Sequence, residues 1–171
     1  MVENYLRQNP LSHIQDQEIH KETDFETNDH VLLINREDSK KFLLRGNSQE
    51  LTFCQAVERT FGCGLPKKSN TAAGGSGFPR LLWLGPGEWL IVTGVFDGNR
   101  LDESSLETFS GQHVQLLDLS DAYAVIGITG TFAREVLAKG CSLDLHPRVF
   151  RSGNVARTIL GRVQVIIHQV K

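Results

Sequence analysis

The sequence predicts an α+β protein built from two similar halves, because one order of elements occurs twice along its 171 residues. In each half a strand-like apolar run ends at a glycine, Gly46 or Gly130, and apolar residues at helical spacing follow it. Each helical stripe ends at a Gly-Cys pair, which begins at Gly62 or Gly140, and a loop then leads into a hairpin pattern. Both halves therefore have the order strand, helix, strand, strand.

The first half, residues 31–119, contains a complete set of predicted elements. Asn47, with Glu50 three residues later, resembles a capping box and marks the start of a helix. Apolar runs on both sides of Gly85-Pro86-Gly87 predict a hairpin. With a short helix and a final strand, the elements take the β-α-β-β-α-β order of a ferredoxin-like unit. They are strands at 31–36 and 40–46, a helix between Asn47 and Phe61, a hairpin at 81–94, a helix at 102–110 and a strand at 114–119.

The second half, residues 120–171, is predicted to be an incomplete copy of the first. Thr131 is a candidate N-cap for its helix, and Gly140 is a candidate left-handed C-cap. The sequence ends directly after the hairpin, so we expect this half to lack its last helix and strand. The predicted elements are a strand at 122–128, a helix at 131–139 and a hairpin at 155–170 that turns at Gly161-Arg162.

Residues 1–30 differ in composition from the rest, and we treat them as an acidic N-terminal extension to one domain at 31–171. They carry seven acidic residues against two basic residues. Two interpretations stay open for them, a segment that lies over another surface and a disordered tail. The rest of the chain can bury one sizeable core, since 40% of the protein is hydrophobic.

Cysteine usage and hydropathy indicate the cellular setting. Cys54, Cys63 and Cys141 form no C-x-x-C pair, so neither a disulfide framework nor a zinc site is indicated, and a cytoplasmic location is expected. No apolar run reaches 18 residues, which predicts neither a signal peptide nor a membrane span. The basic residues of 134–171 are dispersed without interleaved aromatics, which disfavours nucleic acid and favours an acidic protein partner or a small anion.

Carboxylates and histidines are the first candidates for catalytic or metal-binding residues. Asp118 and Asp121 lie on either side of Leu119-Ser120. A turn between strands is favoured over a catalytic carboxylate pair, because no histidine lies at a spacing typical of a catalytic site. His113, His146 and His168 are not at ligand spacing on any one element, so structural or surface roles are favoured over metal binding. The sequence therefore assigns no catalytic, cofactor-binding or metal-binding residue.

Two interpretations are open for each of three further features, which are the tryptophans, a glycine-rich loop and the late arginines. Trp83 and Trp89 are predicted core aromatics, with stacking on a flat ligand such as a pterin or flavin as the alternative. The loop at 65–79 contains Gly-Gly-Ser-Gly but no following Lys-Ser/Thr, so a flexible loop is favoured over a phosphate site. Solvated or interfacial arginines are favoured over ones that grip a carboxylate-bearing ligand. These arginines are Arg148, Arg151, Arg157 and Arg162.

The last predicted strand is apolar on both faces, although no later element is present to cover it. Ile166 and Val170 lie on one face, and the other face carries three branched residues. An uncovered apolar strand favours association, and the arginine-rich loop before the hairpin can orient an acidic partner. The predicted partner interface consists of Arg148, Arg151, Val163, Val165 and Ile167.

Longer motifs resemble the gamma subunit of the heterotetrameric sarcosine oxidases. The resemblance covers about three-quarters of the chain, from Leu43 onward. GPGEWLIV and the DLS motif are also distantly similar to the folate-binding aminomethyltransferase (glycine-cleavage T-protein) fold. The matching segments are LLRG at 43–46, LWLGPGEWLIV at 82–92, DLSDAYAVIGITG at 118–130, VLAKGCSLDLHPRVF at 136–150 and VARTILGRV at 155–163.

The resemblance implies a non-catalytic structural subunit of a flavin-dependent sarcosine (N-methylglycine) oxidase complex, in which oxidative demethylation is coupled to tetrahydrofolate. It implies large alpha and beta flavoprotein partners and a small zinc-binding delta subunit. FAD, FMN, NAD, tetrahydrofolate and zinc are expected in those partners, and none of them in this chain. The alternatives are a free-standing folate-dependent one-carbon protein of the aminomethyltransferase type and a small regulatory binding module.

Overall fold

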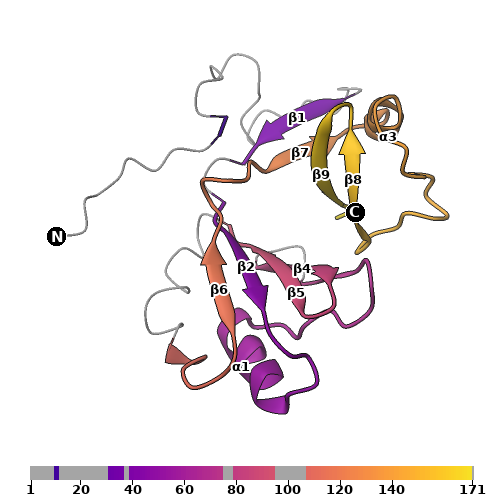
Figure 1. Ribbon diagram of the computed structural model, residues 1–171. Coiled ribbons are helices and arrows are strands. Elements are labelled where there is room, and N and C mark those ends of the chain that lie inside the picture. The colour runs from indigo at the N-terminus through magenta and orange to yellow at the C-terminus, as the bar shows by residue number, and fades with distance from the viewer. Residues whose placement is uncertain (1–9, 12–30, 37–38, 75–78, 95–106, 171) are drawn as a thin grey trace.

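The computed structural model describes residues 10–11, 31–36, 39–74, 79–94 and 107–170 (Figure 1). The predicted mixture of helices and strands is confirmed, with strands predominating. The acidic extension lies almost entirely outside the described residues, as does most of the helix predicted at 102–110. The strands are β1 (Leu32–Asn35), β2 (Lys41–Arg45), β3 (Ala72–Ala73), β4 (Arg80–Gly85), β5 (Glu88–Val92), β6 (Gln115–Asp118), β7 (Ile126–Thr129), β8 (Val155–Leu160) and β9 (Val163–His168), and the helices are α1 (Leu51–Phe61) and α3 (Ala133–Ala138).

A five-stranded sheet forms the centre of the molecule, in the order β3-β4-β5-β2-β6. All neighbouring strands are antiparallel, so β2 and β4 run parallel to each other on either side of β5. Helix α1 connects those two strands. The hairpin predicted around Gly85-Pro86-Gly87 is confirmed as β4–β5.

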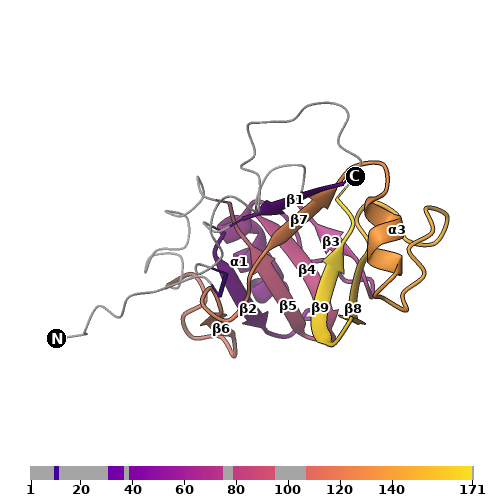
Figure 2. The same cartoon turned by 90° about the horizontal axis from the view of Figure 1, so that it is seen from above.

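Both faces of this sheet are buried because apolar residues occupy successive positions along β4 and β5. On one face Leu44, Leu81 and Trp89 pack with Phe53 and Phe61 of α1 and form the larger core. Residues at the alternate positions belong to a second core on the opposite face. Figure 2 shows the β8–β9 hairpin on that side of the sheet, away from α1. That second core consists of Leu82, Leu84, Leu90, Val92 and Val155, with Ile166 packed against it.

The β8–β9 hairpin covers the second face and is joined to the sheet by backbone hydrogen bonds at its base. Val155 donates its N–H to the carbonyl oxygen of Asn70 at 2.9 Å, and Ala72 donates to Gly153 at 2.8 Å. The hairpin predicted at 155–170 is thus confirmed, and it packs its Val155 and Ile166 side chains inward.

The second half differs from the expected copy of the first. β7 pairs with β1 in a separate two-stranded sheet, and β8 and β9 form another two-stranded sheet with each other. The strand expected at 122–128 begins later, at Ile126, because Ala122 and Tyr123 donate hydrogen bonds to the Leu119 carbonyl in a turn. A strand from the start of the domain, β1, is therefore the partner of the first strand of the second half.

The predicted end of α1 at Gly62 is confirmed, whereas the three predicted helix caps are wrong. Gly62 ends α1 in the left-handed conformation, with φ of 71°. Asn47 forms a turn with Gln49 before the helix, so Glu50 occupies the N-cap position without a side-chain cap. Phe132, rather than Thr131, precedes α3. Gly140 is not left-handed; a Cβ there would lie 3.1 Å from Leu160, so close packing explains the glycine.

In the described part of the chain, no helix is both long enough and apolar enough to cross a bilayer.

We expect Gly46→Ala to lower the free energy of unfolding by about 1 to 3 kcal/mol, which is typical of overpacking. An added Cβ would lie 2.5 to 2.9 Å from three atoms of the Phe53 ring, which is fully buried. Denaturant unfolding of the full chain measures the difference. Gly64→Ala is the matched control, because a Cβ there meets nothing within 4 Å. Equal stability of the two variants would contradict the packing account.

Candidate functional site

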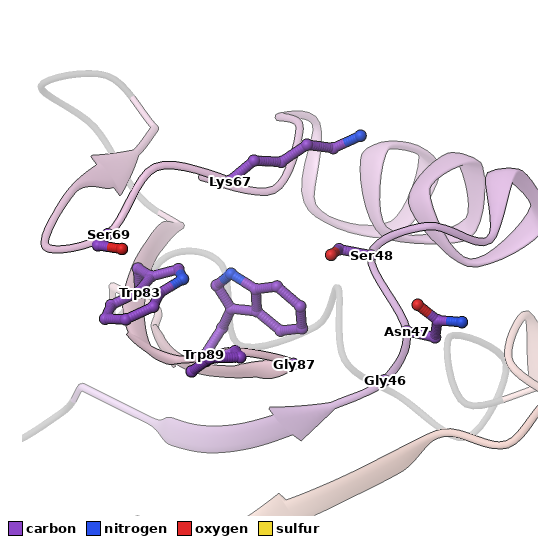
Figure 3. Close-up of a pocket in the computed structure, with 9 residues that line it drawn as sticks. Gly46, Asn47, Ser48, Lys67, Ser69, Trp83, Gly87 and Trp89 are labelled. Atoms are coloured by element: carbon purple, nitrogen blue, oxygen red, sulfur yellow. The ribbon is translucent and has the colours of Figure 1, made fainter.

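A pocket of about 540 Å³ opens between the segment before α1, the loop that follows α1 and the β4–β5 turn (Figure 3). Its volume is within the range of small-molecule sites. Its two tryptophans are recognisable from the sequence as candidate stacking residues, whereas its polar side chains are not, because isolated serines and a lysine in a loop form no recognisable motif. The lining residues are Gly46, Asn47, Ser48, Lys67, Ser69, Trp83, Pro86, Gly87 and Trp89.

The two tryptophans have different roles, although they are direct cross-strand partners. Trp89 is only 1% exposed, packs against Phe53 with ring centroids 5.9 Å apart, and donates its indole N–H to the Pro66 carbonyl at 3.0 Å. The core role predicted for Trp89 is confirmed. Trp83 is half-buried, and it contacts the core while it lines the pocket.

Two glycines bring the backbone segments together at one side of the pocket. Gly46 donates its N–H to the Gly87 carbonyl at 3.1 Å. Gly87 has φ of 73°, and a Cβ at this position would lie 2.9 Å from the Gly46 carbonyl oxygen. The close approach therefore requires glycine at position 87, whereas a Cβ at Gly46 would meet the Phe53 ring instead.

The polar residues of the pocket are hydrogen-bond donors more than acceptors. Lys67 reaches from the loop after α1 over the pocket, while Ser48 and Ser69 present hydroxyls from opposite sides (Figure 3). No aspartate or glutamate is among the lining residues. The pocket therefore carries one positive charge and no negative charge among the residues that line it.

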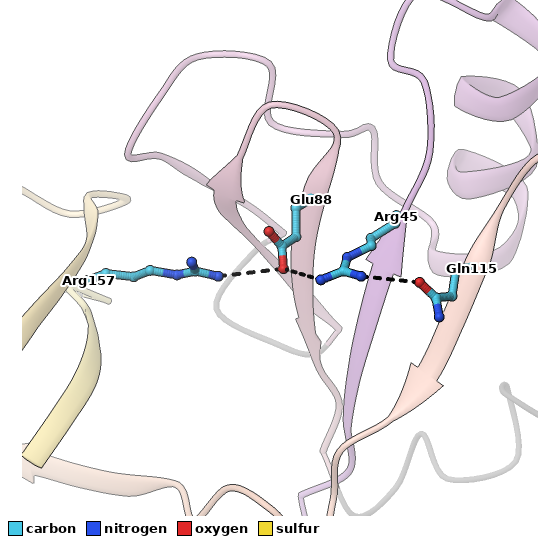
Figure 4. Close-up of polar contacts among 4 residues, drawn as sticks. All are labelled: Arg45, Glu88, Gln115 and Arg157. Atoms are coloured by element: carbon cyan, nitrogen blue, oxygen red, sulfur yellow. Dashed lines mark hydrogen bonds and ion pairs between the residues drawn. The ribbon is translucent and has the colours of Figure 1, made fainter.

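A chain of polar contacts crosses the start of β5, next to Gly87 (Figure 4). Glu88 forms ion pairs with Arg45 at 3.4 Å and with Arg157 of β8 at 3.7 Å, and Arg45 also donates to Gln115 at 3.3 Å. The arginine side chains are about half exposed, so each ion pair contributes no more than about 1 kcal/mol. Arg157 thus has an intramolecular carboxylate partner.

Asp118 and Asp121 belong to a turn around a buried lysine. Ser120 donates its N–H to the Asp118 carboxylate at 2.9 Å, which confirms the predicted turn, and its hydroxyl accepts the N–H of Lys41 at 3.0 Å. Lys41 is 1% exposed. Burial lowers the pKa of its ammonium group, and the two aspartates oppose that shift. The carboxylates thus serve as counter-charges within the structure.

The three histidines expected to act separately are not brought together. His113 and His146 are exposed, and His146 accepts the N–H of Arg148 at its Nδ1. His168 is half-buried on β9 beside Arg80. Among the described residues there is no group of three metal-ligating side chains.

Comparison with known proteins shows which family has this architecture. Residues 45–171 match the profile of the "Sarcosine oxidase, gamma subunit family". The chain belongs to this family. A curated relative, the sarcosine oxidase subunit gamma of an Arthrobacter species, is 33% identical over 112 residues, which is 66% of this chain and 54% of the relative. The chain thus spans about half the length of the curated relatives that it matches.

Solved structures agree with that assignment at the level of the fold. A chain of the heterotetrameric sarcosine oxidase from Corynebacterium sp. U-96, solved in complex with pyrrole 2-carboxylate, superimposes with a TM-score of 0.79 at 27% identity. The match covers 98% of this chain and 83% of that chain. The glycine cleavage aminomethyltransferase T from Bartonella henselae has a TM-score of 0.50 at 14% identity, over 66% of this chain and 32% of its own, which shows similarity of fold alone.

In this gamma-family chain, the residues predicted to form an interface lie in two places, along β9 and in the loop before β8. Val163 is 64% exposed at the start of the strand, whereas Val165 and Ile167 are half-buried. Arg148 and Arg151 are exposed in the loop before β8. The arginine loop lies beside the far end of β9, because Ser152 donates to the Val170 carbonyl and Gly153 to that of Gln169.

Acidification is expected to destabilise this chain through His168. Burial, and secondarily the guanidinium of Arg80, lowers the pKa of His168 from 6.5 to about 4. An unfolded chain binds a proton here near pH 6.5, whereas the folded protein remains neutral at His168 until about pH 4. This contribution to stability is therefore complete above pH 6.5 and decreases as the pH falls towards 4, by at most about 3 kcal/mol.

Denaturant unfolding of the wild type and of His168→Gln across this pH range tests the effect. The variant should show a smaller loss of stability on acidification. His113→Gln removes an exposed imidazole and serves as the control, with an unchanged slope expected. Identical pH profiles for the wild type and His168→Gln would contradict the assignment.

Proposed function

We propose that this chain is a non-catalytic structural subunit of a flavin-dependent sarcosine (N-methylglycine) oxidase complex. The observation that carries the proposal is the family match over residues 45–171, supported by the superposition on a chain of a heterotetrameric sarcosine oxidase. Among the described residues, the turn explains Asp118 and Asp121, and packing in the core explains Trp89. In this role the chain supports chemistry that occurs elsewhere in the assembly.

The proposed partners are large alpha and beta flavoprotein subunits and a small zinc-binding delta subunit in a cytoplasmic complex. FAD, FMN, NAD, tetrahydrofolate and zinc are assigned to those partners. The assembly then performs oxidative demethylation coupled to tetrahydrofolate. The mixed fold and the likeness to aminomethyltransferase T are compatible with a free-standing folate-dependent protein, which is the alternative.

The strand order supports a ferredoxin-like first half as part of this proposal. β2, α1, β4, β5 and β6 follow the sequence order β-α-β-β-β, and their order in the sheet is β4-β5-β2-β6. β1 pairs antiparallel with β7, just as β6 pairs antiparallel with β2. We infer that β1 takes the position of the fourth strand in a second, incomplete ferredoxin-like unit.

The outer face of β9 is the proposed contact with a partner. Val163, Val165 and Ile167 alternate with Ile166, which packs on the second core, so they lie on the opposite face of the strand. Complete burial of such a side chain contributes roughly 1.5 to 3 kcal/mol. Arg148 and Arg151 at the far end of the strand would meet acidic partner residues and affect orientation and association rate more than affinity.

Coexpression with candidate alpha, beta and delta subunits is expected to raise the soluble yield of the chain and to shift it to a larger species in size-exclusion chromatography. Association removes the apolar outer face of β9 from water, which is the physical reason for the gain. Flavin absorbance should follow the large subunits, and the chain purified alone should be colourless. A monomer unaffected by these partners would favour the free-standing alternative.

Val163→Asp is expected to weaken the complex at least tenfold, because it would bury an unpaired carboxylate at the proposed contact. The folded chain should tolerate the change, since Val163 is 64% exposed. Leu51→Asp is the matched control, because Leu51 is 70% exposed at the start of α1, away from β9. Association constants measured by surface plasmon resonance compare the two. Equal effects of both substitutions would place the contact elsewhere.

A further inference from the structure

The pocket beside Trp83 holds donors that the fold itself leaves uncommitted. In the described ranges, the Lys67 ammonium and the hydroxyls of Ser48 and Ser69 form no side-chain hydrogen bond or ion pair, and the Trp83 indole N–H has no acceptor. The Trp89 indole N–H, in contrast, is satisfied by Pro66. The unused donors thus belong to the pocket and not to the core beneath it.

The charge of the residues that line the pocket favours a negatively charged ligand. Lys67 is the single charged residue among those that line the pocket, and the others are neutral. The nearby carboxylates of Glu50 and Glu88 are engaged by Asn47 and by two arginines, respectively. A cation would meet the Lys67 ammonium without a compensating carboxylate, whereas one negative charge would be matched.

The apolar part of the pocket selects the body of that ligand. Trp83 is half-buried and offers an indole surface next to the donors, with Pro86 and the Gly46–Gly87 contact completing the pocket (Figure 3). Aromatic surfaces favour flat groups, which stack with ring centroids within about 7 Å. A phosphate monoester carries close to two negative charges at neutral pH, which a single lysine does not balance.

We propose that this pocket binds a carboxylate attached to a flat apolar group, with the carboxylate at Lys67 and the Ser48 hydroxyl and the flat group against Trp83 (Figure 3). The site is independent of the proposed subunit role and of β9. Its ligand can be a small molecule or the aromatic C-terminus of a polypeptide, because both present the same chemistry.

Intrinsic fluorescence of the full chain tests the proposal, because its only two tryptophans, Trp83 and Trp89, both line the pocket. The probes are N-benzoylglycine and a glycine-serine hexapeptide that ends in phenylalanine with a free carboxylate. We expect saturable quenching by at least one probe at millimolar concentration. Tighter binding of N-benzoylglycine identifies the small-molecule source, and tighter binding of the hexapeptide identifies the polypeptide source.

Two controls separate the carboxylate contact from non-specific stacking. N-benzoylglycinamide, the neutral analogue, should bind at least tenfold more weakly than N-benzoylglycine. Lys67→Gln should weaken binding of the carboxylate probes at least tenfold, whereas Lys68→Gln, next to it but outside the lining, should change it less than twofold. Absence of saturable quenching by both carboxylates, or equal binding to wild type and Lys67→Gln, would overturn the proposal.

Discussion

Burial of the Trp89 indole is the constraint on which the described structure most depends. The ring packs against Phe53 of α1, stands opposite Leu44 of β2 and Trp83 of β4, and donates its N–H to the loop at Pro66. One side chain thereby joins the helix, three strands and the loop after the helix. The pocket lies on these same elements, so its shape follows from the packing of the core.

The central sheet needs covers on both faces, and this need explains how the remote parts of the chain are arranged. α1 covers one face, and β8–β9 covers the other through Val155 and Ile166. The hairpin can satisfy only one face of β9 in this way, which leaves Val163 on the outside. An apolar outer strand is the expected result of this arrangement.

Local features of the fold were predictable from sequence, whereas the distant pairings were not. The β4–β5 turn and the end of α1 at Gly62 follow from local turn and helix-stop chemistry, and α1 follows from its apolar stripe. The β1–β7 pairing joins strands about 90 residues apart, and no periodicity specifies such a partner. The pocket was missed for the same reason, because Ser48 and Lys67 meet only after α1 has folded between them.

The proposed subunit role requires that a partner covers the outer face of β9. Hydrogen–deuterium exchange of the full chain, alone and coexpressed with candidate large subunits, tests it most directly. We expect slower exchange on assembly for residues 163–170 and for the loop at 148–154, with little change in α1. Unchanged exchange of β9 in a stable complex, with new protection at α1 instead, would contradict it.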